Sequence, residues 1–136
     1  MKFVATYSIT VQMLSWKIGP ALATGNSIVL KPSESTPLTA LRLCDLIVQA
    51  GFPPGSINVV NGLGSTVGQA MSEHMEIDKI AFTGSTLTGR RIMEAAARTN
   101  LKKVSLELGG KNPALVFDDA DLDQSVKWAA FGLLLV

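Results

Sequence analysis

Short apolar runs alternate with longer stretches of helical periodicity along this chain, and that order is the strongest constraint on its fold. The runs are rich in Val, Ile and Leu and lack polar alternation, which is typical of strands covered on both faces. The expected strands are residues 27–31, 57–60, 79–83, 104–108 and 114–117. Strands that alternate with helices predict an α/β fold, with an open, mostly parallel sheet of about five strands and flanking helices.

The helical stretches have recognisable ends. They are expected at residues 11–23, 39–50, 66–73, 85–98 and 122–131. Gly51, followed by Phe52 and two prolines, ends the second helix, and Asp121 is placed to cap the last. Gly19 and Pro20 can kink or break the first helix.

The composition is that of one packed globular domain, since 47% of the residues are hydrophobic and 17% are charged. The net charge is +1 and the basic residues are scattered, which argues against a nucleic-acid partner or an anionic membrane surface. No apolar run is long enough to span a bilayer. We therefore expect a soluble protein.

Cysteine and histidine usage points the same way. The single Cys44 cannot pair within the chain, so a reducing compartment is expected, the cytoplasm first and the mitochondrial matrix as the alternative. Cys44 lies among aliphatic residues of a helix and is interpreted as an inert core thiol. His74 is the only histidine, and we therefore expect no metal site.

A lone carboxylate stands out at the end of the fourth expected strand. Glu107 lies between Leu106 and Leu108, and Gly109 and Gly110 follow directly. Apolar neighbours disfavour the charged form of a carboxyl group, and paired glycines let a ligand or backbone come close. Two interpretations stay open from these residues: a proton acceptor, or a strand-edge glutamate that accepts backbone hydrogen bonds.

Two glycine-containing turns follow strands. Gly84 permits a tight turn after the third strand, and Ser85 or Thr86 can cap the next helix, whose free N–H groups form an anion site. Gly62 and Gly64 follow the second strand, but the spacing to the next glycine is not that of a dinucleotide fingerprint. Taken alone, the turn at Gly84 is more simply an ordinary capped strand-to-helix connection, and the glycines after the second strand are weak evidence for a ligand site.

A charged pair follows the first strand. Lys31 can bond ribose hydroxyls or phosphate, and Glu34 can accept from a ribose diol while repelling a 2′-phosphate, which favours NAD over NADP. The alternative is a polar loop. These groups follow three strands, whose carboxyl ends meet at one edge of a parallel sheet. Open α/β sheets bind their ligands at that edge.

Five segments in order carry a resemblance to a known family: residues 16–26, 30–34, 50–55, 82–86 and 106–111. They resemble the coenzyme-binding domain of the NAD(P)-dependent aldehyde dehydrogenase superfamily. The resemblance implies a Rossmann-like sheet, NAD as the cofactor with NADP less favoured, and oxidation of an aldehyde to a carboxylic acid through a cysteine thioester. An aldehyde would bind only in a complete enzyme.

The resemblance also implies roles for particular residues. Glu107 is similar to the family's general base. Cofactor-binding residues are implied at Lys17, Lys31, Glu34, Gly64, Gly84, Ser85, Leu108 and Gly109. Among these, Lys31 and Glu34 resemble the adenosine-ribose contacts. Gly64 resembles part of the adenine-side turn, and Gly84 with Ser85 resembles the pyrophosphate site.

Two departures from the family stand beside these matches. No cysteine follows Glu107, so the nucleophile is missing, and Ser8 stands where an oxyanion-binding asparagine is expected. We therefore expect a truncated fragment, inactive alone: a divergent segment 1–12, a partial coenzyme-binding domain 13–132 and a divergent end 133–136. The alternatives are a stand-alone NAD-binding module and a non-catalytic interaction module that associates with full-length homologues.

Overall fold

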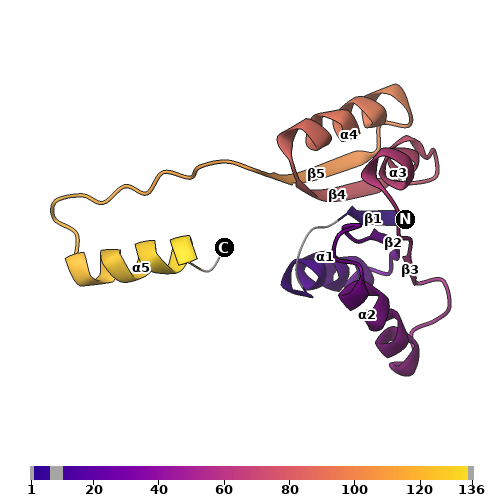
Figure 1. Ribbon diagram of the computed structural model, residues 1–136, viewed down its shortest axis with the longest axis horizontal. Helices are drawn as coiled ribbons and strands as arrows, with labels where there is room; N and C mark the ends of the chain where they lie inside the picture. Colours follow the sequence, from indigo (N-terminus) through magenta and orange to yellow (C-terminus); the bar gives the residue numbers. More distant parts are fainter. Residues whose placement is uncertain (1, 7–10, 135–136) are drawn as a thin grey trace.

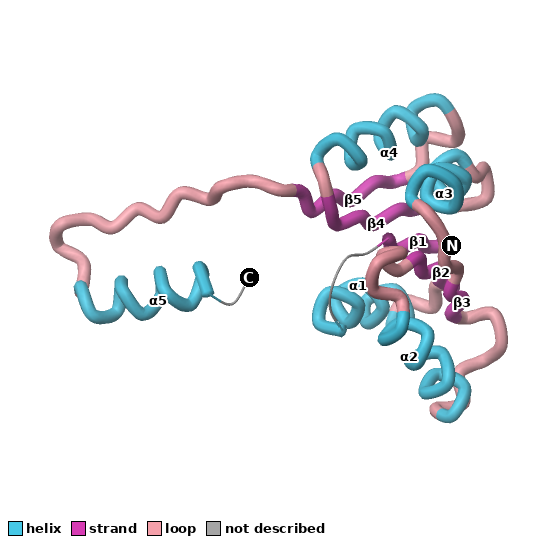
Figure 2. The backbone as a smooth tube through the Cα atoms, viewed as in Figure 1, coloured by secondary structure: helices cyan, strands magenta, loops and turns pink. Residues whose placement is uncertain are grey.

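The protein forms one parallel sheet with helices on both faces (Figures 1 and 2). The computed structural model describes residues 2–6 and 11–134. Its strands are β1 (Lys2–Thr6), β2 (Ser27–Lys31), β3 (Ile57–Val59), β4 (Lys79–Gly84) and β5 (Lys103–Leu108). In the described part of the chain they form a five-stranded sheet of order β3-β2-β1-β4-β5, with every pair parallel. This topology confirms the predicted α/β class.

Four of the five helices in the described chain cover the two faces of the sheet in pairs, and the last lies away from it. The helices are α1 (Val11–Ala23), α2 (Leu38–Gln49), α3 (Gln69–Glu73), α4 (Thr86–Arg98) and α5 (Leu122–Leu134). Helices α1 and α2 lie on one face and α3 and α4 on the other (Figure 1). A π-helical turn, Gly64–Gly68, leads into α3, and α1 continues through Pro20. None of the described helices has the length and apolar character needed to cross a membrane.

Each face of the sheet has its own hydrophobic core, because successive strand side chains point to opposite faces. Ile28 and Leu30 of β2 pack with Leu14 and Ala21 of α1 on one face. On the other face, Ile80 of β4 packs with residues of α3 and α4, including Met71 and Ile92. Burial of each large aliphatic side chain stabilises the fold by roughly 1.5–3 kcal/mol.

The structure corrects two strand assignments. Strand β1 was not expected, yet it is central, since Val4 pairs with Val29 of β2 and with Ile80 of β4. The strand expected at residues 114–117 is wrong: that segment has no strand partner in the described chain and runs away from the sheet (Figure 1). Ser8 lies outside the described residues.

A third correction concerns the strand that carries Glu107. It was expected to be covered on both faces, but β5 is an edge strand and pairs with β4 alone among the described strands. Exposed and half-buried residues alternate along it, and both Glu107 and Leu108 are exposed. The local sequence carried a signal for this, because polar Lys103, Ser105 and Glu107 alternate with apolar residues, as is typical of a strand exposed on one face.

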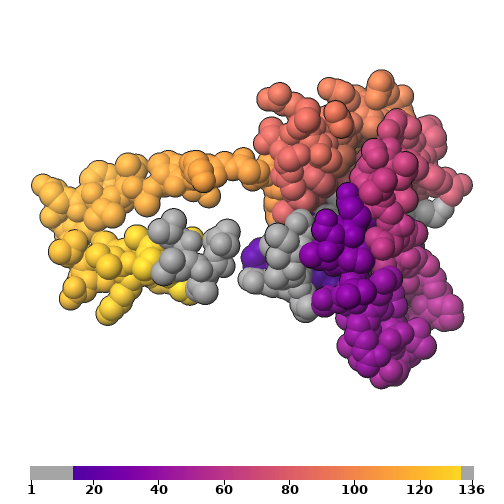
Figure 3. All heavy atoms as spheres, viewed as in Figure 1, coloured from indigo at the N-terminus to yellow at the C-terminus, as the bar shows by residue number. Residues whose placement is uncertain are grey.

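Beyond β5 the chain forms an arm, residues 109–134, that projects away from the sheet (Figures 1 and 3). Asp121 caps α5 as predicted: its Oδ1 accepts a hydrogen bond from the N–H of Gln124 at 2.8 Å. The arm exposes large apolar side chains, among them Leu115 at 82% and Phe117 at 73%. Trp128 and Phe131 contact each other edge to face on α5, and both remain exposed.

The corrected topology predicts that proline is destabilising at one position and tolerated at another. Val4→Pro removes a ladder hydrogen bond from a strand paired on both sides, so the free energy of unfolding should fall by about 3 kcal/mol or more. Leu115→Pro, in the unpaired arm, is the matched control and should leave it nearly unchanged. Urea denaturation followed by circular dichroism measures both. Equal stabilities of the two variants would contradict the central placement of β1.

Candidate functional site

A cleft of about 630 Å³ opens at the carboxyl edge of the sheet. Its walls are the ends of β2 and β4, the π-helical turn, α3 and one side of α4 as far as Arg98. Four residues singled out in the sequence line it: Lys31, Glu34, Gly64 and Gly84. The parallel topology thus confirms that these strand ends share one edge, where open α/β sheets bind ligands.

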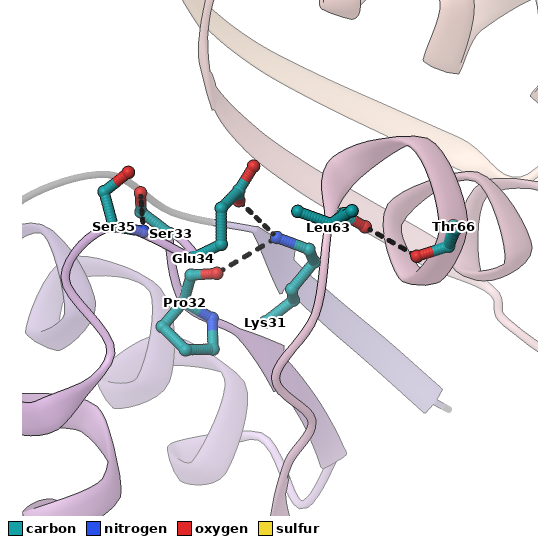
Figure 4. Close-up of polar contacts among 7 residues, drawn as sticks. All are labelled: Lys31, Pro32, Ser33, Glu34, Ser35, Leu63 and Thr66. Atoms are coloured by element: carbon teal, nitrogen blue, oxygen red, sulfur yellow. Dashed lines mark hydrogen bonds and ion pairs between the residues drawn. The ribbon is translucent and has the colours of Figure 1, made fainter.

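Lys31 and Glu34 form an ion pair at one end of this cleft (Figure 4). The Lys31 Nζ donates to Glu34 Oε2 at 3.2 Å and to the carbonyl oxygen of Pro32 at 3.1 Å. The lysine side chain is 6% exposed, whereas that of Glu34 is 45% exposed. The ammonium is therefore held in place, while the carboxylate keeps accepting capacity for a ligand.

Hydrogen bonds keep Glu34 ionised. Its own backbone N–H, then the Lys31 ammonium and, to a smaller extent, the N–H of Gly64 lower the pKa of this carboxyl group. Because Gly64 belongs to the π-helical turn, this carboxylate links the loop after β2 to the turn before α3. A carboxylate that is ionised and half exposed is suited to accept hydrogen bonds from a diol.

Gly84 and Ser85 form the tight turn between β4 and α4. A Cβ on Gly84 would lie 2.5 Å from Cζ of Phe82, so only glycine fits without displacing that ring. Ser85 is the N-cap of α4: its Oγ accepts from the N–H of Thr88 at 3.2 Å and donates to Thr88 Oγ1 at 2.9 Å. The capping prediction is therefore confirmed. The N-terminus of α4 adjoins the cleft and offers backbone donors to an anion.

A second polar group crosses three elements of the fold. The Lys17 Nζ donates to Thr83 Oγ1 at 2.6 Å, and Thr83 Oγ1 donates to Glu107 Oε2 at 2.9 Å. Lys17 is 8% exposed, and its burial lowers the pKa of the ammonium, an effect that the negative charge of Glu107 opposes. Thr83 also lines the cleft, so it joins this Lys17–Thr83–Glu107 chain to the ligand-sized space.

The remaining predicted residues lie beside these two groups. Leu108 packs on α4, where a Cβ on Gly89 would lie 2.8 Å from Leu108 Cδ2, and the exposed Gly109 begins the arm. Neither residue lines the cleft. Cys44 is half buried in α2 and its thiol donates to the carbonyl oxygen of Ala40 at 3.5 Å, so it does not have the core position that the sequence predicted. The described residues contain no cluster of His, Cys, Asp or Glu suited to a metal ion.

The bridging role of Thr83 was not predicted. It follows from the strand register, in which Thr83 of β4 pairs directly with Glu107 of β5. Two arginines that line the cleft from α4, Arg91 and Arg98, were not predicted either. Their helical spacing from Thr88, three residues and then seven more along the same face, could have identified them once Gly84 was assigned to the site.

The bridged contact of Lys17 with Glu107, through Thr83, predicts a directional pKa change. Glu107→Gln removes the negative charge that favours the ammonium, so the pKa of Lys17 should fall further below its usual value. NMR titration of the Lys17 side chain measures this change, with Glu94→Gln on the exposed face of α4 as the control. An unchanged Lys17 pKa in Glu107→Gln would contradict the contact.

The same lowered pKa has a consequence for folding. Between the folded pKa of Lys17 and its higher unfolded value, the unfolded chain binds more protons than the folded one, so the free energy of unfolding should rise with pH across that window. Denaturation at several alkaline pH values measures the slope. Lys17→Met should remove this part of it, and an equal slope in the variant would argue against the assignment.

Comparisons with known proteins agree with this geometry. A model of the aldehyde dehydrogenase family matches residues 1–136. An aldehyde dehydrogenase from Agaricus bisporus is 68% identical over 130 residues, which make up 96% of this chain and 26% of that protein. The chain therefore spans about a quarter of the length of the curated relatives it matches.

Solved structures give the same result. The structure of PnpE in complex with nicotinamide adenine dinucleotide is 53% identical, with a TM-score of 0.84, and the match covers 96% of this chain and 27% of that one. An indole-3-acetaldehyde dehydrogenase complexed with NAD+ is 47% identical, with a TM-score of 0.88, and the match again covers 96% of this chain and 27% of that one.

Proposed function

This chain belongs to the aldehyde dehydrogenase family, and we propose that it forms the coenzyme-binding part of such an enzyme, with a nicotinamide dinucleotide in the cleft at the carboxyl edge of the sheet. One observation carries the proposal: a paired lysine and glutamate and a capped helix N-terminus lie on the walls of a single cleft. The partial domain predicted at residues 13–132 is extended to include β1, Lys2–Thr6, the central strand of its sheet. We place the protein in the cytoplasm, with the mitochondrial matrix as the alternative.

The adenosine ribose is assigned to Lys31 and Glu34. The buried ammonium donates to a ribose oxygen, and the half-exposed carboxylate accepts from the diol. A 2′-phosphate placed there would meet a carboxylate whose ionised form is stabilised by its hydrogen bonds, which disfavours NADP. Gly64 completes this end of the cleft, because its N–H is directed at the same carboxylate.

The pyrophosphate is assigned to Gly84 and Ser85. Backbone N–H groups at the start of α4 supply donors, and the helix dipole favours negative charge at that end. Gly84 lets the phosphate approach the backbone closely, because no Cβ stands in the way. Lys17, Leu108 and Gly109 are assigned to the nicotinamide side, beyond β4, on the strength of the resemblance.

Glu107 is assigned as the general base of the complete enzyme. Its carboxylate is exposed at the end of β5 and oriented by Thr83, which in turn is held by Lys17. In this role it accepts a proton from water or from the thiol. When bound, the coenzyme would accept the hydride that leaves the substrate.

The chain alone is proposed to have little or no dehydrogenase activity. The reaction needs a cysteine thiolate that attacks the aldehyde carbon and holds the acyl group as a thioester until water releases the acid. The only cysteine, Cys44, lies in α2 and lines no part of the cleft.

A second candidate function is favoured by the exposed apolar side chains of the arm. Leu115, Phe117 and Trp128 are at least 65% exposed, and such surface marks sites of protein association. In this alternative the chain is a non-catalytic interaction module that binds a full-length homologue. Co-purification with such a homologue supports it, and a monodisperse monomer that ignores the homologue removes it.

The ribose assignment predicts a change in coenzyme preference. Glu34→Ala removes the carboxylate acceptor, so the affinity for NAD should fall about tenfold while the affinity for NADP falls less or rises. Isothermal titration calorimetry with both coenzymes measures the ratio. Asp119→Ala, in the arm, is the control, and a preference equal to that of the wild type in Glu34→Ala would refute the assignment.

The absence of a cysteine at the site predicts that the chain binds the coenzyme without catalysing the reaction. The purified chain should bind NAD but produce no NADH when an aldehyde is added, because no thiolate is available at the site. NADH absorbance at high protein concentration measures turnover. Robust turnover that disappears in Glu107→Gln would overturn the claim that the chain is inactive alone.

A further inference from the structure

A third lysine of this fold is buried away from the residues assigned to the coenzyme. Lys102 lies just before β5 and is 6% exposed. Its Nζ donates to the carbonyl oxygen of Ser72 at 2.6 Å and to Thr99 Oγ1 at 3.0 Å. A buried ammonium costs free energy unless its donors are satisfied, so these two bonds make its position specific.

The turn that contains Lys102 binds a whole stretch of main-chain carbonyls. Asn100 Nδ2 donates to the carbonyl oxygens of Met75 at 2.7 Å and of Ile77 at 2.9 Å. Asn100 and Lys102 together donate hydrogen bonds to three backbone carbonyl oxygens between α3 and β4. The last carbonyls of a helix have no partner within the helix, and Lys102 supplies one for Ser72.

Helix α3 has only five residues and continues directly from the five of the π-helical turn Gly64–Gly68, so the whole helical stretch is short. Isolated helices of that length are not stable in water and depend on tertiary contacts. Burial lowers the pKa of the Lys102 ammonium, and the negative charge of the nearby Glu73 carboxylate opposes this effect. The contact thus joins α3 to the turn that follows α4 through a short, charge-assisted hydrogen bond.

Helices α3 and α4 both line the cleft. Ser72 and Glu73 line it from α3, and Arg91 and Ala95 line it from α4. We propose that Lys102 is a positioning residue that fixes α3 against α4 through the Ser72 carbonyl and Thr99, and so sets the width of the cleft without touching the ligand. The link to coenzyme affinity rests on the proposed function. The contact of Lys102 with Ser72 and Thr99, which we call the clamp, does not.

The test compares Lys102→Met with Lys103→Met in the full chain, since Lys103 is an exposed neighbour. In Lys102→Met, amide hydrogen exchange within Gln69–Glu73 should speed up about tenfold, and the Kd for NAD should rise by a similar factor. Lys103→Met should change neither. The Kd is measured on the folded fraction, so a residue that only supports stability would leave it unchanged. Lys102→Arg, which keeps a cationic donor, should recover part of both effects.

Each outcome decides a separate claim. Exchange in Lys102→Met equal to that in Lys103→Met overturns the clamp, and faster exchange with an unchanged Kd overturns its control of the cleft. If the wild-type chain fails to bind NAD, the proposed function fails and exchange alone decides the clamp. If Lys102→Met does not fold, Thr99→Val replaces it, because this variant removes one of the two acceptors of Lys102. Thr99→Val should change exchange and Kd in the same direction by a smaller factor. Exchange equal to that of the wild type in Thr99→Val overturns the clamp.

Discussion

Parallel pairing of β1 with both β2 and β4 is the constraint on which the rest of the structure depends. It joins the β2–β3 side of the sheet to the β4–β5 side, and each face of the joined sheet has its own pair of helices and its own core. Because every strand runs in the same direction, Lys31, Gly84 and Leu108 end at one edge. The cleft is a consequence of that arrangement: without β1, the loop after β2 and the turn after β4 would have no fixed relation.

The charged groups at this edge follow one pattern. In each case a buried lysine interacts with an exposed carboxylate. Lys31 forms an ion pair with Glu34, and Lys17 is linked to Glu107 by hydrogen bonds through Thr83. Burial of the cation is compensated by hydrogen bonds within the protein. The acceptor is left facing solvent, where a ligand can use it. Charge at the site is therefore held by the fold and not by flexible surface side chains.

The features that sequence could predict were those with local causes. The alternation of apolar runs and helical stretches predicted the parallel sheet, and Ser85 and Asp121 were identifiable as caps from their neighbours. Strand β1 was missed because its importance comes from two neighbours distant in sequence, whereas the apolar run 114–117 has strand character but no partner. The burial of Lys102 likewise depends on tertiary position, whereas the exposure of Glu107 was indicated by the polar and apolar alternation of residues 103–108.

The central claim is that the carboxyl edge of this sheet is a dinucleotide site. Titration of the isotopically labelled chain with NAD, followed by its backbone amide resonances, tests it most directly. The account predicts saturable shifts at residues 31–34, at Gly64 and at residues 84–88, with α5 unchanged. A folded chain whose resonances do not move, or move only along the arm, would contradict it.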